Sequence, residues 1–163
     1  MAQFIRPDSN ITQTSFTGGF AEIDETSPSD ADFAYGANNT SAVLEVGLSN
    51  PSVPSSGTCT VRYRIAKVNN GVLSGSGNSV SITCAIYEGA TLIATDAAQT
   101  TTGTWTTFTF TFDSTLVTDW TDVRLRFTTT ASGGSPANRR GGAVSWAEVE
   151  IPDAPTTRYI LIT

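Results

Sequence analysis

The chain has 163 residues, a length that suits one domain with a sizeable core and no need for disulfide staples. Its net charge of −6, from nine basic and 15 acidic residues, argues against binding to nucleic-acid phosphates, which requires clustered Lys and Arg. With no histidine, one lysine and two cysteines, the chain nearly lacks the side chains that most often perform acid–base and zinc chemistry.

Threonine is the most informative residue type, because many of its 27 copies alternate with apolar residues. Residues 105–112, for example, are Trp-Thr-Thr-Phe-Thr-Phe-Thr-Phe. Successive side chains on a strand point to opposite faces, so this alternation predicts strands with one buried and one polar face.

Such patterns, bounded by Gly, Pro and Asn turns, predict about ten short strands. In chain order, the strands are expected at residues 3–6, 19–23, 33–35, 42–48, 58–68, 79–88, 91–95, 104–112, 122–128 and 143–151. One helical turn is expected at 114–120, with Ser114 as its N-cap. No segment has a sustained helical period, so the predicted fold class is all-β, an antiparallel β-sandwich with a jelly-roll-like arrangement.

The inward faces of these strands form the expected core. The core residues predicted are Leu44, Val46, Val61, Tyr63, Ile82, Ile86, Phe108, Phe110, Val123, Leu125 and Phe127. Because the phenylalanines of 104–112 form the most apolar face, truncation of Phe110 to Ala is expected to cost about 3–5 kcal/mol if its ring is buried.

The domain is expected to span residues 1–152, and a linker with an apolar tail to span 153–163. Tyr159, Ile160, Leu161 and Ile162 cannot all bury on one face of a strand, because neighbouring side chains point opposite ways. The tail is therefore expected to dock on a neighbouring subunit; the alternative is that it folds back on its own sandwich.

No segment has the pattern of a signal peptide or the run of about 18 apolar residues of a membrane span, so we expect a soluble protein made in a cytoplasm. In that compartment Cys59 and Cys84 are expected to be free thiols in the core, rather than a disulfide or a metal pair. The acidic stretch 22–32 offers carboxylates to calcium but matches no EF-hand loop, so no metal or cofactor is expected.

Four arginines occupy i, i+2 positions on two predicted strands: Arg62, Arg64, Arg124 and Arg126. Glu148 and Glu150 are similarly spaced on 143–151, with Val144 and Trp146 expected on the same side. These charges are interpreted either as solvated ion pairs across a sheet or as a polar subunit interface, where Arg and Trp are enriched.

Trp105, Trp120 and Trp146 could form an aromatic platform for sugars, or could serve as core and rim residues. No nucleophile and base are visibly paired in the sequence. Nothing places a Glu–Asp pair across a cleft as glycoside hydrolysis requires, so the chain is not expected to be an enzyme and has no predicted catalytic residue.

Several segments, in order, resemble a group of small β-sandwich proteins encoded among the structural genes of tailed bacteriophages and prophages. They are 6–10 (RPDSN), 23–33 (IDETSPSDADF), 61–65 (VRYRI), 120–127 (WTDVRLRF) and 144–152 (VSWAEVEIP). The resemblance covers roughly residues 5–152, and the family form has an acidic residue at Asn10 and usually an aliphatic one at Cys84.

This resemblance implies a non-catalytic part of the virion. The expected role is a capsid decoration or cement protein on the capsid surface, whose partners are the major capsid protein and further copies of the chain, a trimer included, with no nucleic acid and no membrane. The alternative is a tail or fibre module that recognises host surface glycans. The partner-binding residues expected are Arg62, Arg64, Arg124, Arg126, Trp146 and the apolar tail residues Tyr159, Ile160, Leu161 and Ile162.

Overall fold

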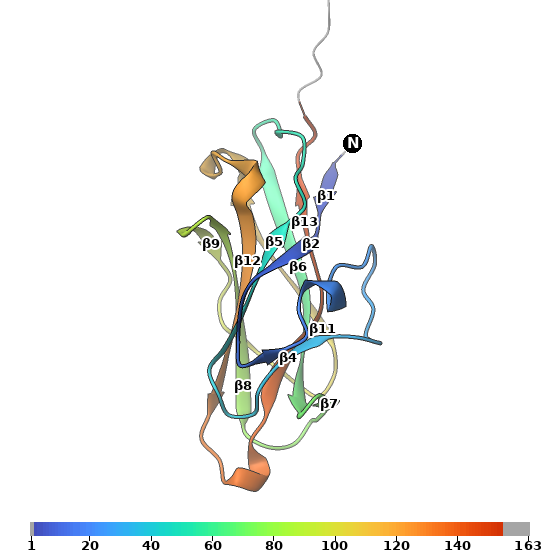
Figure 1. Ribbon diagram of the computed structural model, residues 1–163, viewed down its shortest axis with the longest axis vertical. Helices are drawn as coiled ribbons and strands as arrows, with labels where there is room; N and C mark the ends of the chain where they lie inside the picture. Colours follow the sequence, from blue (N-terminus) through green and yellow to red (C-terminus); the bar gives the residue numbers. More distant parts are fainter. Residues whose placement is uncertain (1, 155–163) are drawn as a thin grey trace, which may run out of the picture.

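Two antiparallel β-sheets pack face to face in the computed structural model, which describes residues 2–154 (Figure 1). This architecture confirms the predicted all-β sandwich. Helical structure within the described residues consists of 3₁₀ turns: η1 (Phe20–Glu22), η2 (Ser114–Leu116), η3 (Trp120–Asp122) and η4 (Pro136–Asn138). No helix in that part of the chain is long and apolar enough to cross a membrane.

Sheet A follows the order β11–β6–β13–β4–β3, so β11 forms one of its lateral edges. Its strands are β11 (Thr106–Asp113), β6 (Thr58–Asn69), β13 (Gly141–Ile151), β4 (Ala34–Gly36) and β3 (Phe16–Thr17). In addition, β1 (Gln3–Ile5) pairs with β13, and β7 (Val72–Leu73) pairs with β6.

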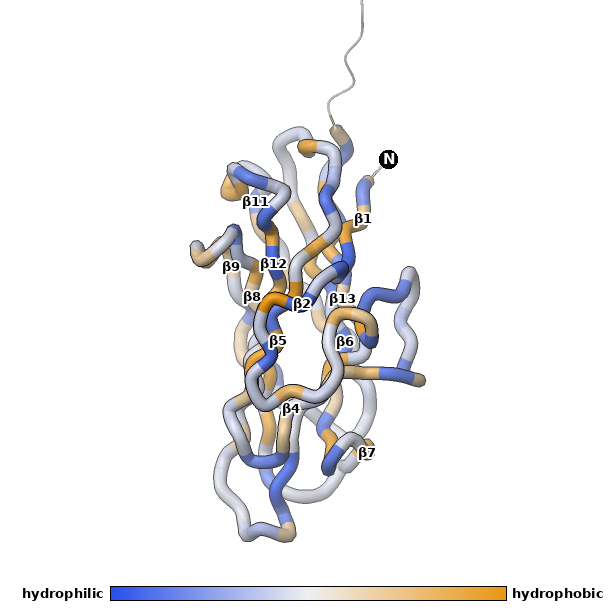
Figure 2. The backbone as a smooth tube through the Cα atoms, in the orientation of Figure 1, coloured by the Kyte–Doolittle hydropathy of each residue, from blue (hydrophilic) through white to orange (hydrophobic). Residues whose placement is uncertain are grey.

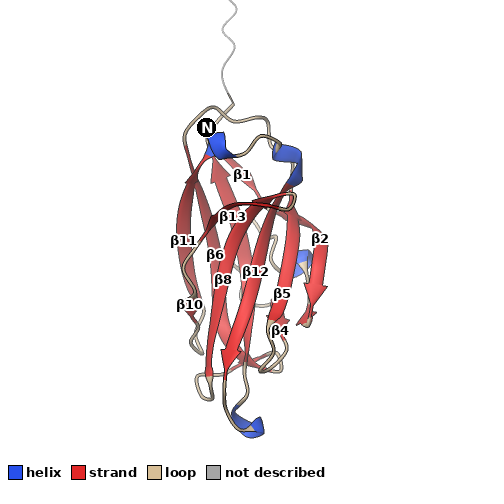
Figure 3. Cartoon of the chain, turned by 90° about the vertical axis from the view of Figure 1, so that its left-hand side faces the viewer, coloured by secondary structure: helices blue, strands red, loops and turns tan. Residues whose placement is uncertain are grey.

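Sheet B follows the order β10–β8–β12–β5–β2, and β9 pairs with β8. Its strands are β10 (Gln99–Thr100), β8 (Ser79–Glu88), β12 (Val123–Ser132), β5 (Ala42–Leu48), β2 (Pro7–Thr14) and β9 (Thr91–Thr95). Figure 3 shows β8, β12 and β5 side by side along the length of the molecule. Alternate side chains of the two sheets meet in the core, and hydrophobic stretches follow the strands (Figure 2).

Most of the predicted core is confirmed. The buried members are Leu44, Val46, Val61, Tyr63, Ile82, Ile86, Val123, Leu125 and Phe127. Tyr63 joins the two sheets, because its ring centroid lies 6.0 Å from that of Phe127 on β12 and its hydroxyl donates to Asp96 at 2.6 Å.

Cys59 and Cys84 are buried free thiols, as predicted, and they lie on strands of opposite sheets. Burial raises the pKa of the Cys59 thiol to about 12 and raises the pKa of Cys84 well above its usual value. Both thiols therefore stay protonated and serve as small apolar side chains.

The strands at 42–48, 79–88 and 91–95 have the predicted bounds. β2 was not predicted, because it begins at Pro7 and is interrupted by two register shifts against β5, which an edge strand tolerates. The predicted strand at 19–23 is wrong, since η1 occupies that segment.

The single helical turn predicted at 114–120 is split into η2 and η3. Ser114 is not the N-cap but lies inside η2. The side chain of Asp113 accepts the Thr115 N–H at the start of η2, and Asp119 accepts the Thr121 N–H at the start of η3. Aspartate caps both turns because its carboxylate can accept a backbone N–H that the short turn leaves unpaired.

Phe108 and Phe110 are only partly buried, which corrects their predicted place in the core. Both lie on β11, where the edge of the sheet leaves part of each ring in water, whereas Phe112 on the same strand is 6% exposed.

We expect Phe127→Ala to lower the free energy of unfolding by about 3–5 kcal/mol, because its ring is fully buried. Phe110→Ala should lower it by about half as much or less, since less apolar surface is lost. Chemical denaturation of both variants measures the two values, and equal losses would contradict the difference in burial.

Candidate ligand-binding site

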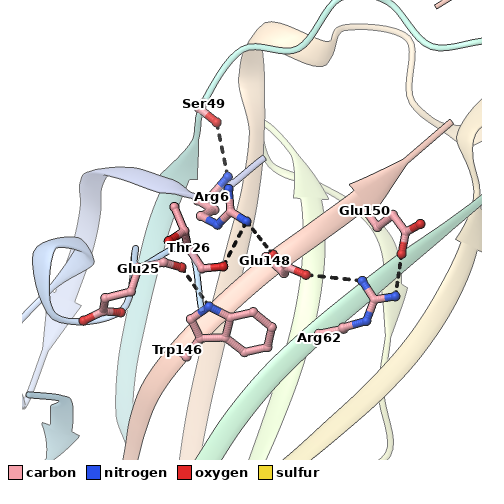
Figure 4. Close-up of polar contacts among 8 residues, drawn as sticks. All are labelled: Arg6, Glu25, Thr26, Ser49, Arg62, Trp146, Glu148 and Glu150. Atoms are coloured by element: carbon pink, nitrogen blue, oxygen red, sulfur yellow. Dashed lines mark hydrogen bonds and ion pairs between the residues drawn. The ribbon is translucent and has the colours of Figure 1, made fainter. Parts of the chain in front are cut away.

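A network of ion pairs covers part of the outer face of sheet A (Figure 4). Arg62 on β6 donates to Glu148 at 3.3 Å and also to Glu150, both on β13. Arg6 donates to Glu148 at 2.8 Å. Arg62 and Glu148 are direct neighbours in the ladder, which confirms that opposite charges face each other across these strands.

Trp146 lies on the same outer face, but the acidic loop (residues 24–32) covers it. Its indole N–H donates to the carbonyl oxygen of Glu25 at 2.8 Å, and the residue is 4% exposed (Figure 4). A bulge between Val144 and Trp146 turns the indole outward while Val144 stays in the core, so the two do not share a face as predicted.

Arg64 holds the acidic loop against the sheet. Its Nε and Nη2 atoms donate to Oδ1 and Oδ2 of Asp30 at 2.7 and 2.8 Å, and the Ser145 hydroxyl donates to Asp30 at 3.0 Å. The hydrogen bond from Arg64 lowers the pKa of Asp30 below its usual value, so the carboxylate is ionised at neutral pH. The pair is therefore neutral overall and geometrically fixed.

Three partly exposed aromatic side chains, Phe33, Tyr35 and Trp105, lie close to this ion pair, and we call them the aromatic row. The ring centroids of Phe33 and Trp105 are 5.2 Å apart, in an edge-on arrangement, and those of Phe33 and Tyr35 are 6.1 Å apart. Such contacts stabilise aromatic clusters beyond the burial of their area.

Two alanines form the floor of the aromatic row. Ala66 on β6 pairs with Ala143 on β13, and Ala143 pairs in turn with Tyr35 on β4. The register of β11 against β6 places Trp105 beside Ala66. Both alanines are fully buried, and the ring contacts of Phe33 link Trp105, directly before β11, to Tyr35 on β4.

This arrangement has the chemistry of a carbohydrate subsite. Aromatic rings offer flat apolar surface to the C–H faces of a sugar, while fixed polar groups beside them orient its hydroxyls. Arg64 and Asp30 supply both kinds of hydrogen-bonding group, and Arg64 Nη1 also contacts the Thr107 hydroxyl at 3.3 Å.

The outer face of sheet B differs in character. Glu45, whose side chain is 5% exposed, accepts hydrogen bonds from Arg124 at 3.2 Å and Arg126 at 2.7 Å, and Arg126 stacks 4.0 Å above the centre of the Tyr87 ring. Arg124 also pairs with Asp122 at 2.7 Å. Because Glu45 is buried, the two arginines are needed to compensate its charge.

Exposed apolar residues flank these arginines. Leu92 pairs with Tyr87 across the β8–β9 ladder and is 51% exposed, and Ile11 on β2 is 44% exposed. Ile11, Asp122 and Arg124 line a polar pocket of about 220 Å³, which is smaller than the usual volume of a small-molecule site. The surface between Ile11 and Leu92 is thus better suited to a protein than to a small ligand.

The predicted partner-binding residues do not form one surface. Arg62, Arg64 and Trp146 belong to the outer face of sheet A, and Arg124 and Arg126 to that of sheet B. All four arginines are engaged in ion pairs. The predicted tail contacts lie outside the described residues.

The three tryptophans do not form a shared platform, and the alternative reading as core and rim residues fits Trp120 and Trp146. Trp120 is buried in the core and Trp146 is covered by the acidic loop, so only Trp105 is available. Its partners, Phe33 and Tyr35, were missed. Their i, i+2 spacing on a predicted strand was the available signal, since it places both side chains on one face.

Two carboxyl groups of the acidic loop, those of Glu25 and Asp32, interact with each other. Burial, together with the hydrogen bond and charge of Asp32, raises the pKa of Glu25 from 4.5 to about 7. Two hydrogen-bonded carboxyl groups leave no room for the sugar that lies between a glycosidase pair. The described residues contain no cluster of three or more Asp, Glu, His or Cys side chains that could hold a metal ion.

No protein-family model and no curated protein matches the sequence. Among solved structures, the chain is similar to a CBM35 from Paenibacillus barcinonensis, at 18% identity and a TM-score of 0.46, over 87% of this chain and 95% of that one. It is also similar to the N-terminal cellulose-binding domain of Cellulomonas fimi β-1,4-glucanase C, at 15% identity and a TM-score of 0.45, over 88% and 90% of the two chains.

A third similar structure is the Stig cyclase Fisc from Fischerella sp. TAU, at 18% identity and a TM-score of 0.49, over 86% of this chain and 73% of that one.

The raised pKa of Glu25 predicts a specific pH dependence. The folded state keeps this proton up to about pH 7, whereas the unfolded chain loses it near 4.5, so a rise in pH through this window lowers the free energy of unfolding. Between pH 4.5 and about 7, the free energy of unfolding of Glu25→Gln should rise steadily relative to that of the natural chain. Above about pH 7 the difference between the two should stay constant. Thermal unfolding at several pH values measures this, and a difference that does not change with pH would contradict it.

Proposed function

We propose that the chain is a non-catalytic binding module that recognises a neutral carbohydrate through the aromatic row. The observation on which this rests is the continuous surface of Phe33, Tyr35 and Trp105 over an alanine floor, beside the Arg64–Asp30 pair. Because that pair is neutral overall, it offers hydrogen bonds to hydroxyl groups without favouring a charged ligand.

The absence of catalysis is part of the proposal and is supported by the state of the reactive groups. Both thiols are buried and their pKa values are raised, so neither is a nucleophile at neutral pH. The Tyr63 hydroxyl is held by Asp96, and the Glu45 carboxylate is held by two arginines. The aromatic row lies beside none of these groups.

The setting we propose is a bacteriophage virion, where the module recognises glycans of the host surface from a tail or fibre. The resemblance of segments such as 23–33 and 61–65 to phage structural proteins supports this setting. The same segments contain Asp30, Phe33 and Arg64, so the residues that carry the resemblance also build the proposed site.

Trp105→Ala should reduce affinity for a bound neutral oligosaccharide about tenfold or more, which corresponds to about 1.4 kcal/mol, because it removes a large stacking surface. The matched control is Tyr87→Ala on sheet B, which should bind as the natural chain does. A panel of neutral oligosaccharides and host surface polysaccharide supplies the ligands for calorimetry. No binding to any of them, or equal loss in both variants, would contradict the proposal.

The second candidate function is decoration of the capsid, with the outer face of sheet B against the major capsid protein. Exposed Ile11 and Leu92 beside Tyr87 and Arg124 favour it, because aromatic residues and Arg are enriched in protein interfaces and apolar surface drives their association. Weak contacts repeated over a symmetric shell would add up to firm attachment.

Quantification of the chain against the coat protein in purified virions separates the two candidates. Decoration predicts on the order of hundreds of copies, because each subunit contact repeats over the shell, whereas a tail or fibre predicts a handful. If decoration holds, Tyr87→Ala should lower the occupancy of the shell and Trp105→Ala should not. The reverse result would exclude sheet B as the docking face.

A further inference from the structure

Three of the four lateral edges of the sandwich are unsuited to pairing with another strand. In sheet A, β3 has two residues. In sheet B, the edge strand β2 is interrupted by two register shifts against β5. The opposite edge of sheet B is divided between β10, which has two residues, and β9, whose pairing with β8 has a register shift. Short strands and bulges of this kind prevent edge-to-edge association.

The fourth edge, β11, has none of these features. Its eight residues, Thr-Thr-Phe-Thr-Phe-Thr-Phe-Asp, pair with β6 in one unbroken register. They include no Pro, Gly, Lys or Arg, and Phe108 and Phe110 remain partly exposed. No strand within the described residues pairs with the other side of β11, which follows one margin of the molecule in Figure 3. Such an edge is a template for an added strand.

We propose that residues 155–163 of a second copy of this chain add as a strand to β11. This segment, Pro-Thr-Thr-Arg-Tyr-Ile-Leu-Ile-Thr, is rich in aromatic and β-branched residues, which favour strands. Nine extended residues span about 30 Å and the eight of β11 about 26 Å, so their lengths match.

The segment also begins at the end of the molecule where β11 ends. The carbonyl oxygen of Asp153 accepts the Ser55 N–H at 2.9 Å, and the Ser55 carbonyl oxygen accepts the Ser114 hydroxyl at 3.1 Å, directly after β11. Two copies that meet at this end can exchange their tails reciprocally, which gives a closed, two-fold assembly.

A second copy is favoured over the chain's own tail because both faces of the segment are apolar. Tyr159 and Leu161 would lie on one face of the added strand, and Ile160 and Ile162 on the other. One face would cover Phe108 and Phe110, while in a single copy the other face would remain in water. Where two copies exchange their tails, the two segments come together at the junction, so their second faces can pack against each other.

The test compares three variants with the natural chain by light scattering after size exclusion and by hydrogen exchange. The first ends at Ala154. The second is Thr109→Lys with Thr111→Lys, which places charge on exposed positions of the β11 edge opposite the apolar tail and Arg158. The third, a control with the same added charge at exposed positions of other edges, is Thr91→Lys with Thr100→Lys.

We expect the natural chain and the control to form the same oligomer, and the truncated and β11 variants to be folded monomers. Amides of β11 should exchange about tenfold faster or more in the truncated chain, with β13 unchanged. If the natural chain is a monomer and its tail still slows hydrogen exchange of β11, the added strand is the chain's own tail and the proposed second copy is wrong. If removal of the tail changes neither the oligomeric state nor the hydrogen exchange of the β11 amides, the whole proposal is wrong.

Discussion

The Arg64–Asp30 ion pair determines how the outer face of sheet A is built. It fastens the acidic loop to β6 by two hydrogen bonds of 2.7 and 2.8 Å, three residues before Phe33. The loop then covers Trp146, and Phe33 arrives against Trp105. Without this attachment the loop would depend on single hydrogen bonds, such as those from Trp146 to the Glu25 carbonyl oxygen and from Ser145 to Asp30. The acidic stretch is therefore a structural strap, and the pKa of Glu25, raised to about 7 by burial and by Asp32, predicts that its stability depends on pH.

The two outer faces of the sandwich have different chemistry, although each has paired arginines at its centre. On sheet A the charges are accompanied by a row of aromatic rings over alanines, which suits a sugar. On sheet B they surround the buried Glu45, between exposed Leu92 and Ile11, which suits a protein surface. A sandwich can present two such surfaces on opposite sides without interference between the two.

The sequence pattern predicted the sandwich because alternation is a property of single strands. The long central strands, such as 42–48 and 79–88, were predicted with their observed bounds. β2 was not, since Pro7 and two bulges break its period. Phe108 and Phe110 were placed in the core because the pattern cannot reveal that β11 is an edge. The site was harder still: Ala66, Ala143 and Tyr35 come from three strands and Trp105 directly precedes β11, so only the strand pairing brings them into one row. The spacing of the charges indicated that arginines and glutamates would face each other if their strands were neighbours, and the pairing of β6 with β13 meets that condition for Arg62 and Glu148.

The most direct test of the binding face uses the indole N–H resonances of the three tryptophans, which report on three different environments. Trp105 is partly exposed in the aromatic row, Trp120 is in the core, and Trp146 is beneath the acidic loop. During titration with a neutral oligosaccharide selected by binding, the account predicts that the Trp105 resonance shifts with saturation while the other two remain in place. Saturable binding that leaves the Trp105 resonance unmoved would show that the ligand lies elsewhere and would contradict the account.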